Sequence, residues 1–268
     1  MISRVTRRLA PAIVIALLAA ASAGCDIVTA DLRSEESSTW QKTYTVGANG
    51  RLEIGNVNGR IRAEPTDGNT VEVTATKKAR GATPEQAKAA LDRASIVESV
   101  EPNSVKLETK IQRTQGIVFN GGNLQVEYTV KVPAGVEVRL TTTNGGITVT
   151  GLKGRVFAET TNGGVEARGV TGQLEASTTN GGLDIDLAAV ADGGVKLECT
   201  NGGINVRLPR EAKATISASI TNGGISSDSL PIDVVGEKSR RRLEGRMNGG
   251  GPRLQIEGTN GGITLTAR

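Results

Sequence analysis

The sequence predicts an all-β protein: a single-stranded right-handed β-solenoid, or β-helix, with short coils of about 18–21 residues and one short flanking helix. Three observations lead to this prediction. The tripeptide Asn-Gly-Gly recurs at nearly constant spacing, the residues around each copy alternate between apolar and polar, and aromatic residues make up only 2% of the chain. With 35 glycines among 268 residues and so few aromatic rings, the core must be thin and filled by aliphatic side chains, which suits flattened coils.

The first 24 residues have the features of a bacterial export signal. A basic stretch at residues 1–8 precedes an apolar run at residues 11–23, which is too short to cross a bilayer comfortably. Small residues then lead directly to Cys25, and this arrangement resembles the lipobox, in which the cysteine is lipidated and becomes the first residue of the mature protein. We expect Cys25 to carry a membrane anchor and residues 25–38 to form a polar tether. An ordinary secretory signal, cleaved near Ala23, is the alternative.

The net charge gives no reason to expect nucleic-acid binding. The formal net charge is +4, and three of the basic residues, Arg4, Arg7 and Arg8, lie in the export signal, which contains no acidic residue. The rest of the chain is therefore close to +1, without the basic balance that is typical of nucleic-acid-binding domains.

The main signal is the internal repeat, which is most regular over residues 120–268. Copies of Asn-Gly-Gly begin at Asn120, Asn144, Asn162, Asn180, Asn201, Asn222, Asn248 and Asn260. From Asn144 to Asn222 the spacings are 18, 18, 21 and 21 residues. Glycine adopts positive φ without strain, and asparagine tolerates left-handed backbone and bonds nearby amides. The six copies preceded by threonine are therefore predicted to form a structural ladder of turns, comprising Asn144, Asn162, Asn180, Asn201, Asn222 and Asn260.

Two short strands flank each turn. Apolar or small residues occupy alternate positions on both sides, as in Val156, Ala158 and Thr160 before one turn and Val165 and Ala167 after it. Alternation of this kind predicts strands with one buried face. Near-identical successive turns favour a solenoid, in which each strand pairs with its equivalent one coil away. An antiparallel meander with Asn-Gly hairpins is the alternative.

Residues 39–119 predict a less regular start to the same domain, which spans residues 39–268. Strands are expected at residues 52–61, 71–75 and 105–111. Between them Thr83 is a predicted helix N-cap, with Pro84 at the first helical position and Gln86 completing a capping box; this helix is expected to run over about residues 84–95. Near the other end, residues 238–246 form a basic insertion containing Arg240–Arg242, which predicts an exposed hairpin or loop.

Together these segments resemble a known bacterial family. The polar exported N-terminus, the segment at residues 52–61, the helix near residue 85 and the serial Asn-Gly-Gly turns ending in Gly261-Gly262-Ile263-Thr264-Leu265 are similar to the bacterial adhesin-type domain of unknown function, over about residues 40–268. The resemblance implies a β-helical fold and an envelope or stress-associated accessory protein. It supplies no catalytic residues.

Few residues suggest chemistry. The chain contains no histidine, which excludes serine–histidine triads, histidine-based zinc sites and imidazole bases. Cys199 falls in the same inward position as Thr160 and Thr178, which predicts a buried small side chain rather than a nucleophile. Asn-Gly-Gly is followed by Ile, Val or Leu, not by the aspartate of a calcium β-roll. The sequence predicts no cofactor, no metal site and no catalytic residue.

Acidic residues form the remaining candidate surface. Asp184 and Asp186 lie two apart on one strand and therefore share a face, while Glu159, Glu175 and Glu198 are expected to form an outward stack. Two interpretations stay open: a solvated face that keeps the solenoid soluble, or an acidic cleft or cation site. The Arg240–Arg242 run is a solvated loop in one interpretation and a contact with anionic lipid in the other.

The predicted function is therefore binding, adhesion or structural scaffolding by an exported, lipid-anchored β-solenoid at the bacterial envelope, facing the periplasm or the exterior. The expected partners are the membrane, through Cys25, and an envelope protein or polysaccharide. An accessory or regulatory role in envelope stress signalling and a carbohydrate-active enzyme using Asp184 and Asp186 are the alternatives. The sequence does not predict the ligand, the membrane leaflet or the oligomeric state.

Overall fold

The computed structural model describes residues 34–47, 49–112, 124–227 and 230–268. Cys25, residues 25–33 of the predicted tether and the Asn-Gly-Gly copy at Asn120 lie outside these ranges. Strands dominate the described residues, which contain a single α-helix, as predicted. None of the described helices is both long enough and apolar enough to cross a membrane.

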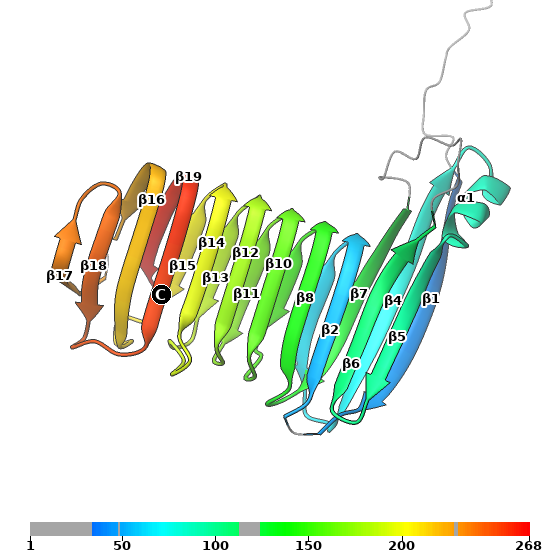
Figure 1. Ribbon diagram of the computed structural model, residues 1–268, viewed down its shortest axis with the longest axis horizontal. Coiled ribbons are helices and arrows are strands. Elements are labelled where there is room, and N and C mark those ends of the chain that lie inside the picture. Colours follow the sequence, from blue (N-terminus) through cyan, green and yellow to red (C-terminus); the bar gives the residue numbers. More distant parts are fainter. Residues whose placement is uncertain (1–33, 48, 113–123, 228–229) are drawn as a thin grey trace, which may run out of the picture. The chain divides into compact units, whose positions relative to one another are not determined.

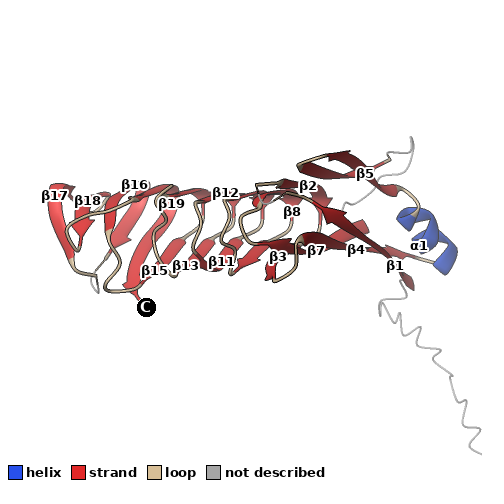
Figure 2. Ribbon diagram, turned by 90° about the horizontal axis from the view of Figure 1, so that it is seen from below, coloured by secondary structure: helices blue, strands red, loops and turns tan. Residues whose placement is uncertain are grey.

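Successive coils stack on one another with parallel strands. The strands that precede each turn are β2 (Arg51–Asn58), β8 (Glu137–Asn144), β10 (Val156–Asn162), β12 (Leu174–Asn180) and β14 (Val195–Asn201). Those that follow each turn are β3 (Ile61–Thr66), β9 (Ile147–Thr150), β11 (Val165–Val170), β13 (Leu183–Leu187) and β15 (Ile204–Leu208). We call these two sets the pre-turn face and the post-turn face (Figure 2).

The register of the parallel strands follows the repeat. Asn144 pairs with Asn162, Asn162 with Asn180, and Asn180 with Asn201, so every turn lies on its equivalent in the next coil. Figure 1 shows β8, β10, β12 and β14 side by side in this order. An antiparallel meander of these strands is thereby excluded.

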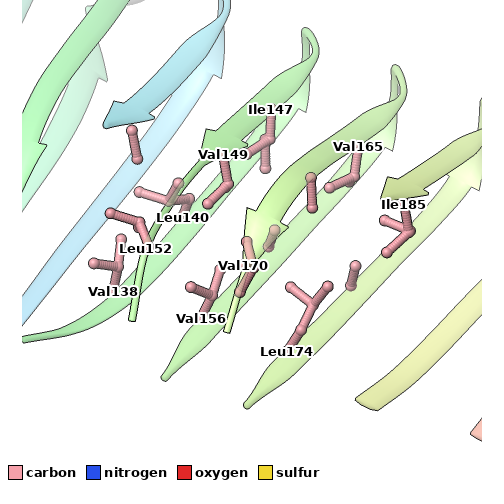
Figure 3. Close-up of a cluster of buried hydrophobic side chains, with 14 of the residues drawn as sticks. Val138, Leu140, Ile147, Val149, Leu152, Val156, Val165, Val170, Leu174 and Ile185 are labelled. Carbon is pink, nitrogen blue, oxygen red and sulfur yellow. The ribbon is translucent and has the colours of Figure 1, made fainter. Parts of the chain in front are cut away.

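The core lies between the two faces and is built from columns of aliphatic side chains. Val138, Val156 and Leu174 form one such column on the pre-turn face, and Ile147 and Val165 form another on the post-turn face (Figure 3). All five are at most 1% exposed. Small and branched side chains fill these columns because the two faces lie close together, which explains how the fold manages with so few aromatic rings.

One coil of the stack, formed by β2 and β3, comes from a distant part of the chain. β2 pairs in parallel with β8, so that Asn58 lies opposite Asn144, and β3 pairs in parallel with β9. On the other side of this coil, β6 (Ser104–Ile111) pairs in parallel with β2, and β7 (Leu124–Pro133) pairs in parallel with β3. Three antiparallel strands complete this end: β1 (Ser34–Thr45), β4 (Thr70–Gly81) and β5 (Ala94–Glu101). β1 begins inside the range predicted as tether, because residues 34–38 pair in antiparallel register with β4.

The helix α1 (Pro84–Leu91) is shorter than predicted. Its start is as expected, since the Thr83 side chain accepts a hydrogen bond from the Gln86 amide at 3.3 Å. The Gln86 side chain reaches back to the amide of Ala82 rather than to that of Thr83. The predicted end near residue 95 is wrong, because Ala94 already begins β5 and pairs with Ile111 of β6. β-Branched residues after Ala94 favour this strand over a further helical turn.

The C-terminal end departs from simple sequential stacking. β16 (Ala214–Ser226) and β19 (Arg253–Ala267) each run through a turn and contribute to both faces. β19 lies between β14 and β16, in parallel register with both. Asn260 therefore separates Asn201 from Asn222, and the expectation that each coil lies on the next one in sequence is wrong at this point.

The basic insertion forms a hairpin, as predicted. β17 (Ile232–Lys238) and β18 (Arg242–Met247) are antiparallel, and β18 pairs with β16. Their connecting loop covers the last turn, because the carbonyl of Arg241 accepts from the Ile220 amide and that of Arg240 from the Ile225 amide. The main chain of the arginine run is thus part of the fold.

Candidate functional site

The asparagines of the turns form one continuous ladder of side-chain hydrogen bonds. The Nδ2 of Asn144 donates to Asn58, Asn162 to Asn144, Asn180 to Asn162, Asn201 to Asn180, Asn260 to Asn201 and Asn222 to Asn260, over 2.7–3.0 Å. All six asparagines named from the repeat belong to this ladder. Asn58 extends it, and the sequence signal for Asn58 was the shorter Asn-Gly pair in an otherwise similar strand-turn-strand segment.

Asn248 does not belong to the ladder although it begins an Asn-Gly-Gly tripeptide. Its φ is 53°, and its Nδ2 donates to the carbonyls of Arg210 and Ala212 at 2.8 Å each. This tripeptide connects β18 to β19, so a turn motif from the repeat here forms an ordinary loop.

The first glycine of each turn is required by the stack. Gly163 has a φ of 157°, and a Cβ there would overlap the carbonyl oxygen of Gly145 in the neighbouring coil. The same holds at Gly181 and Gly202. That carbonyl also has a side-chain partner, because Thr160 Oγ1 donates to the Gly145 oxygen at 2.8 Å. Close backbone approach between coils therefore depends on this glycine.

Cys199 occupies the corresponding position one coil further along. Its Sγ lies 3.3 Å from the carbonyl oxygen of Gly181, where Thr178 makes the equivalent bond to Gly163 at 2.7 Å. The side chain is buried, and burial raises the pKa of the thiol above its usual value. A buried thiol with a raised pKa is a poor nucleophile, which agrees with a packing role.

The second glycine of each turn lines a groove instead. A Cβ at Gly203 would lie 3.8 Å from its nearest neighbour, an ordinary contact, and the φ of Gly203 lies outside the left-handed region. In the coil of β2 and β3 the equivalent residue is Arg60, so the column accepts a side chain at that position as well as at Gly203. A Cβ at Gly164, between them, would lie only 3.0 Å from the Gly182 carbonyl oxygen. Gly146, Gly164, Gly182 and Gly203 form part of the wall of an open groove of about 880 Å³ on the post-turn face.

Charged residues also line this groove. Arg60 and Arg62 lie at its β3 end, together with Glu64, while Glu166, Arg168 and Asp184 come from β11 and β13. Glu166 pairs with Arg168, and Asp184 pairs with Arg207 at 2.6 Å. The sequence reasoning named Asp184 but missed the arginines. The signal that identifies Arg60 is its place directly after Asn58-Gly59, where the other turns have their second glycine.

The five predicted acidic residues do not converge. Asp184 and Asp186 lie on the post-turn face, and Arg268 Nε is 3.6 Å from an Asp186 oxygen. Glu159, Glu175 and Glu198 lie on the pre-turn face. Within the ranges described, no three acidic or cysteine side chains are grouped as metal ligands.

The expected stack of three glutamates is wrong in one member. Glu159 lies in register with Ser177, and Ser177 with Glu198, so these two glutamates share a column with a serine between them. Glu175 lies in the next column, between Phe157 and Lys196. Glu175 lies two residues further from its turn than Glu159 and Glu198 lie from theirs. It therefore occupies the neighbouring outward column.

Comparison with known proteins identifies the family. Residues 53–266 match the model of Toastrack DUF4097, a domain of unknown function. No curated protein gives a significant match. One similar crystal structure is that of a cell-adhesion candidate from Clostridium sporogenes ATCC 15579. The match has 12% sequence identity and a TM-score of 0.48, and it covers 86% of this chain and 100% of that chain. Another is that of an adhesin candidate from Bacteroides fragilis NCTC 9343; this match has 14% sequence identity and a TM-score of 0.39, and it covers 86% of this chain and 97% of that chain. Because the family model matches most of its length, the chain belongs to the Toastrack family.

Proposed function

We propose that the protein is a non-enzymatic binding protein of the bacterial cell envelope, and that it holds an extended partner in the groove of its post-turn face. The observation that carries the proposal is the groove itself. It is open along several coils, and its wall repeats the same residue type from coil to coil. A surface that repeats every coil suits a partner that also repeats, because the same contact is made several times.

The polar groups of the groove favour binding over catalysis. Catalysis by carboxylates needs two acids facing one reacting bond. In the groove, Glu166 and Asp184 are each paired with an arginine, and the glutamates of the pre-turn face lie elsewhere. Paired acids of this kind hold their side chains in a fixed place along the surface, which suits binding.

Attachment to the membrane through lipid on Cys25 is part of the proposal. It rests on the export signal at residues 1–24 and the small residues before Cys25. We take residues 25–33 as the tether and the domain as beginning with β1. We also take the coil as right-handed, the hand that right-twisted strands favour in parallel crossovers.

Replacing Cys25 with serine tests the anchor. The Cys25→Ser variant has no thiol to lipidate, so it is expected in the soluble fraction, whereas the unchanged protein partitions with membranes. Fractionation followed by immunoblotting measures this. A Cys199→Ser variant is the matched control and is expected to stay with the membranes. Membrane attachment of the Cys25→Ser variant would contradict the anchor.

Filling the groove tests the binding surface. The Gly203→Gln variant adds a long side chain to the groove wall at a position where the backbone accepts one. Ser177→Gln, on the pre-turn face, is the control. Both variants and the reference protein also carry Cys25→Ser, so that the lipid anchor does not hold them to membranes. Each is incubated with isolated cell envelopes, and the bound fraction is measured after sedimentation. We expect binding to be lost in Gly203→Gln and retained in Ser177→Gln. Equal binding by both variants would contradict a role for the groove.

A further inference from the structure

The charge at one end of the groove points to the chemistry of its ligand. We propose that the groove binds a linear acidic polysaccharide, whose carboxylates contact Arg60 and Arg62. This inference rests on the proposed binding function and adds to it the class of ligand and the residues that select it.

Among the described residues that line the groove, the charged side chains without an ion pair are Arg60, directly before β3, and Arg62 and Glu64, on β3. Arg60 and Arg62 are exposed, and neither forms an ion pair with another described residue. The acids further along the groove are already neutralised by Arg168 and Arg207. Glu64 is the third charged residue at this end; its register neighbour Lys131 pairs with Glu72, so two arginines face one glutamate here. The β3 end of the groove therefore carries positive charge that an anionic group can neutralise.

Backbone donors add a second means of recognition. The carbonyls of Gly164, Gly182 and Gly203 accept hydrogen bonds from the amides of Ile147, Val165 and Leu183 in the neighbouring coil, over 2.9–3.0 Å. Within the described chain, the amides of these three glycines donate to no backbone carbonyl. They recur once per coil, about 4.8 Å apart, and without a Cβ a ligand can approach them closely. Hydroxyl and carboxylate oxygens are suitable acceptors for such donors.

The position of the groove disfavours an extended peptide. Peptide strands are captured at sheet edges, where unpaired backbone groups remain. This groove lies over the interior of the post-turn face, where strands β9, β11 and β13 are paired on both sides. A peptide strand also repeats about every 6.6–6.8 Å, which does not match coils about 4.8 Å apart. One sugar ring of an extended glycan advances by about the height of one coil, so each ring meets an equivalent set of groups.

The lining also favours an acidic glycan over a neutral one. Neutral sugars are commonly held by stacking on aromatic rings, and none of the described residues that line this groove is aromatic. Arginine and backbone amides bind carboxylates instead. Recognition by charge predicts that affinity falls as salt concentration rises.

The experiment measures binding of the full-length protein in detergent to polygalacturonate by isothermal titration. Dextran serves as the neutral glycan and polyglutamate as the acidic peptide. We expect binding to polygalacturonate only, weakened at least tenfold in the double variant Arg60→Gln/Arg62→Gln and in Gly203→Gln. Arg139→Gln removes the same charge from the pre-turn face and is expected to change the affinity by less than twofold.

Several results would overturn the proposal. Absence of polygalacturonate binding would reject the ligand class, and so would equal binding of polyglutamate. Unchanged affinity in the arginine double variant would reject the assigned site. These outcomes differ from a failure of the proposed function. If only the ligand class were wrong, the protein would still bind cell envelopes, and Gly203→Gln would still abolish that binding.

Discussion

At the scale of single residues, the two glycines of each turn have different tasks. The first lets neighbouring coils approach, because a Cβ there would meet a backbone oxygen that cannot move away. The second leaves the groove open and has room for a methyl group at Gly203. One of these adjacent residues therefore affects the stability of the fold, while the other affects the surface that a ligand contacts.

The neighbouring glycines Gly202 and Gly203 allow a matched test. Gly202→Ala combines a positive φ of 147° with a clash against the Gly181 carbonyl, and we expect it to lower the free energy of unfolding by about 3 kcal/mol or more. Gly203→Ala is expected to change it by less than about 1 kcal/mol. Urea unfolding monitored by circular dichroism measures both. Similar losses in the two variants would show that the second glycine is also structural.

The buried tyrosines predict a loss of stability at alkaline pH. Burial is the main cause that raises the pKa of Tyr44, assisted by its 2.7 Å hydrogen bond to Glu98, and burial also raises the pKa of Tyr128. In the unfolded chain both titrate near pH 10. The stabilisation is therefore complete below about pH 10 and declines as the pH rises toward the folded-state pKa values, because only the unfolded chain then releases its protons.

Urea unfolding at pH 9 and pH 11 measures this effect. We expect the free energy of unfolding to fall by about 1 kcal/mol over this interval through Tyr44, and Tyr128 is expected to add to the fall in the same direction. Tyr44→Phe, which lacks the ionisable hydroxyl, should show a smaller fall between the two pH values than the unchanged protein. If the two proteins respond identically, Tyr44 does not contribute to the alkaline response.

Residue patterns predicted which side chains point inward, because alternation depends only on the geometry of a strand. They also predicted that Cys199 is buried and that the asparagines of the turns form a ladder. They failed where two outward columns had to be distinguished, as with Glu175, since both columns are solvated and carry the same kinds of residue. Arg60 was missed although its place directly after Asn58-Gly59 is a sequence signal, and Arg62 was missed because a charged side chain on an outward strand position gives no signal until the groove is known.

At the scale of elements, the asparagine ladder joins coils that are otherwise held by backbone bonds and the core. Every amide in it donates in the same direction, from Asn222 through Asn260 and Asn201 toward Asn58. An inner member therefore makes two side-chain bonds within the ladder, while Asn222 at the end makes one. The basic loop at residues 239–241 closes the turn at this end through its backbone.

Alanine substitutions at an inner and an end position test the ladder. Asn180→Ala removes two hydrogen bonds, and we expect it to lower the free energy of unfolding by about 1–2 kcal/mol. Asn222→Ala removes one and should cost about half as much. Chemical denaturation of both variants provides the comparison. A larger loss at Asn222 than at Asn180 would mean that the ladder contributes little.

Element boundaries were predicted well where a local signal exists and poorly elsewhere. Thr83 and Pro84 mark the start of α1 through capping chemistry that acts within a few residues. The end of α1 depends on the pairing of β5 with β6, a tertiary contact that local sequence does not specify. The hairpin of β17 and β18 was expected from the basic insertion, but its cover over the last turn was not.

At the scale of the whole described domain, the order of coils differs from the order of the sequence at both ends. β2 and β3 lie between β6 and β7 on one side and β8 and β9 on the other, although β6 and β7 follow them in the sequence. At the other end, β19 lies between β14 and β16. The spacing of the repeat predicts which residues form one coil, but not which other coil lies next to it. All coils share one register, so the sequence pattern is compatible with several orders of stacking.

Removing β19 tests its place between two earlier strands. A chain that ends at Pro252 loses four side chains that are at most 1% exposed: Leu254, Ile256, Ile263 and Leu265. Their burial contributes about 6–12 kcal/mol, comparable to the whole stability of a typical domain. We therefore expect the shortened chain to lose cooperative unfolding, measured by urea denaturation.

A peptide of residues 253–268 is the control for this truncation. Because the strand is bounded by β14 on one side and β16 on the other, added peptide should bind the shortened chain and restore a cooperative transition. A scrambled peptide should not. If the shortened chain unfolds at the same urea concentration as the full chain, β14 and β16 can pair directly and β19 is dispensable.

The location of β19 also has a consequence for when the molecule can finish folding. β19 follows β16, β17 and β18 in the sequence, yet it completes a layer that β14 on one side and β16 on the other require. Stacking in the order of the sequence therefore stops at β15, and β16 joins the stack only together with β19.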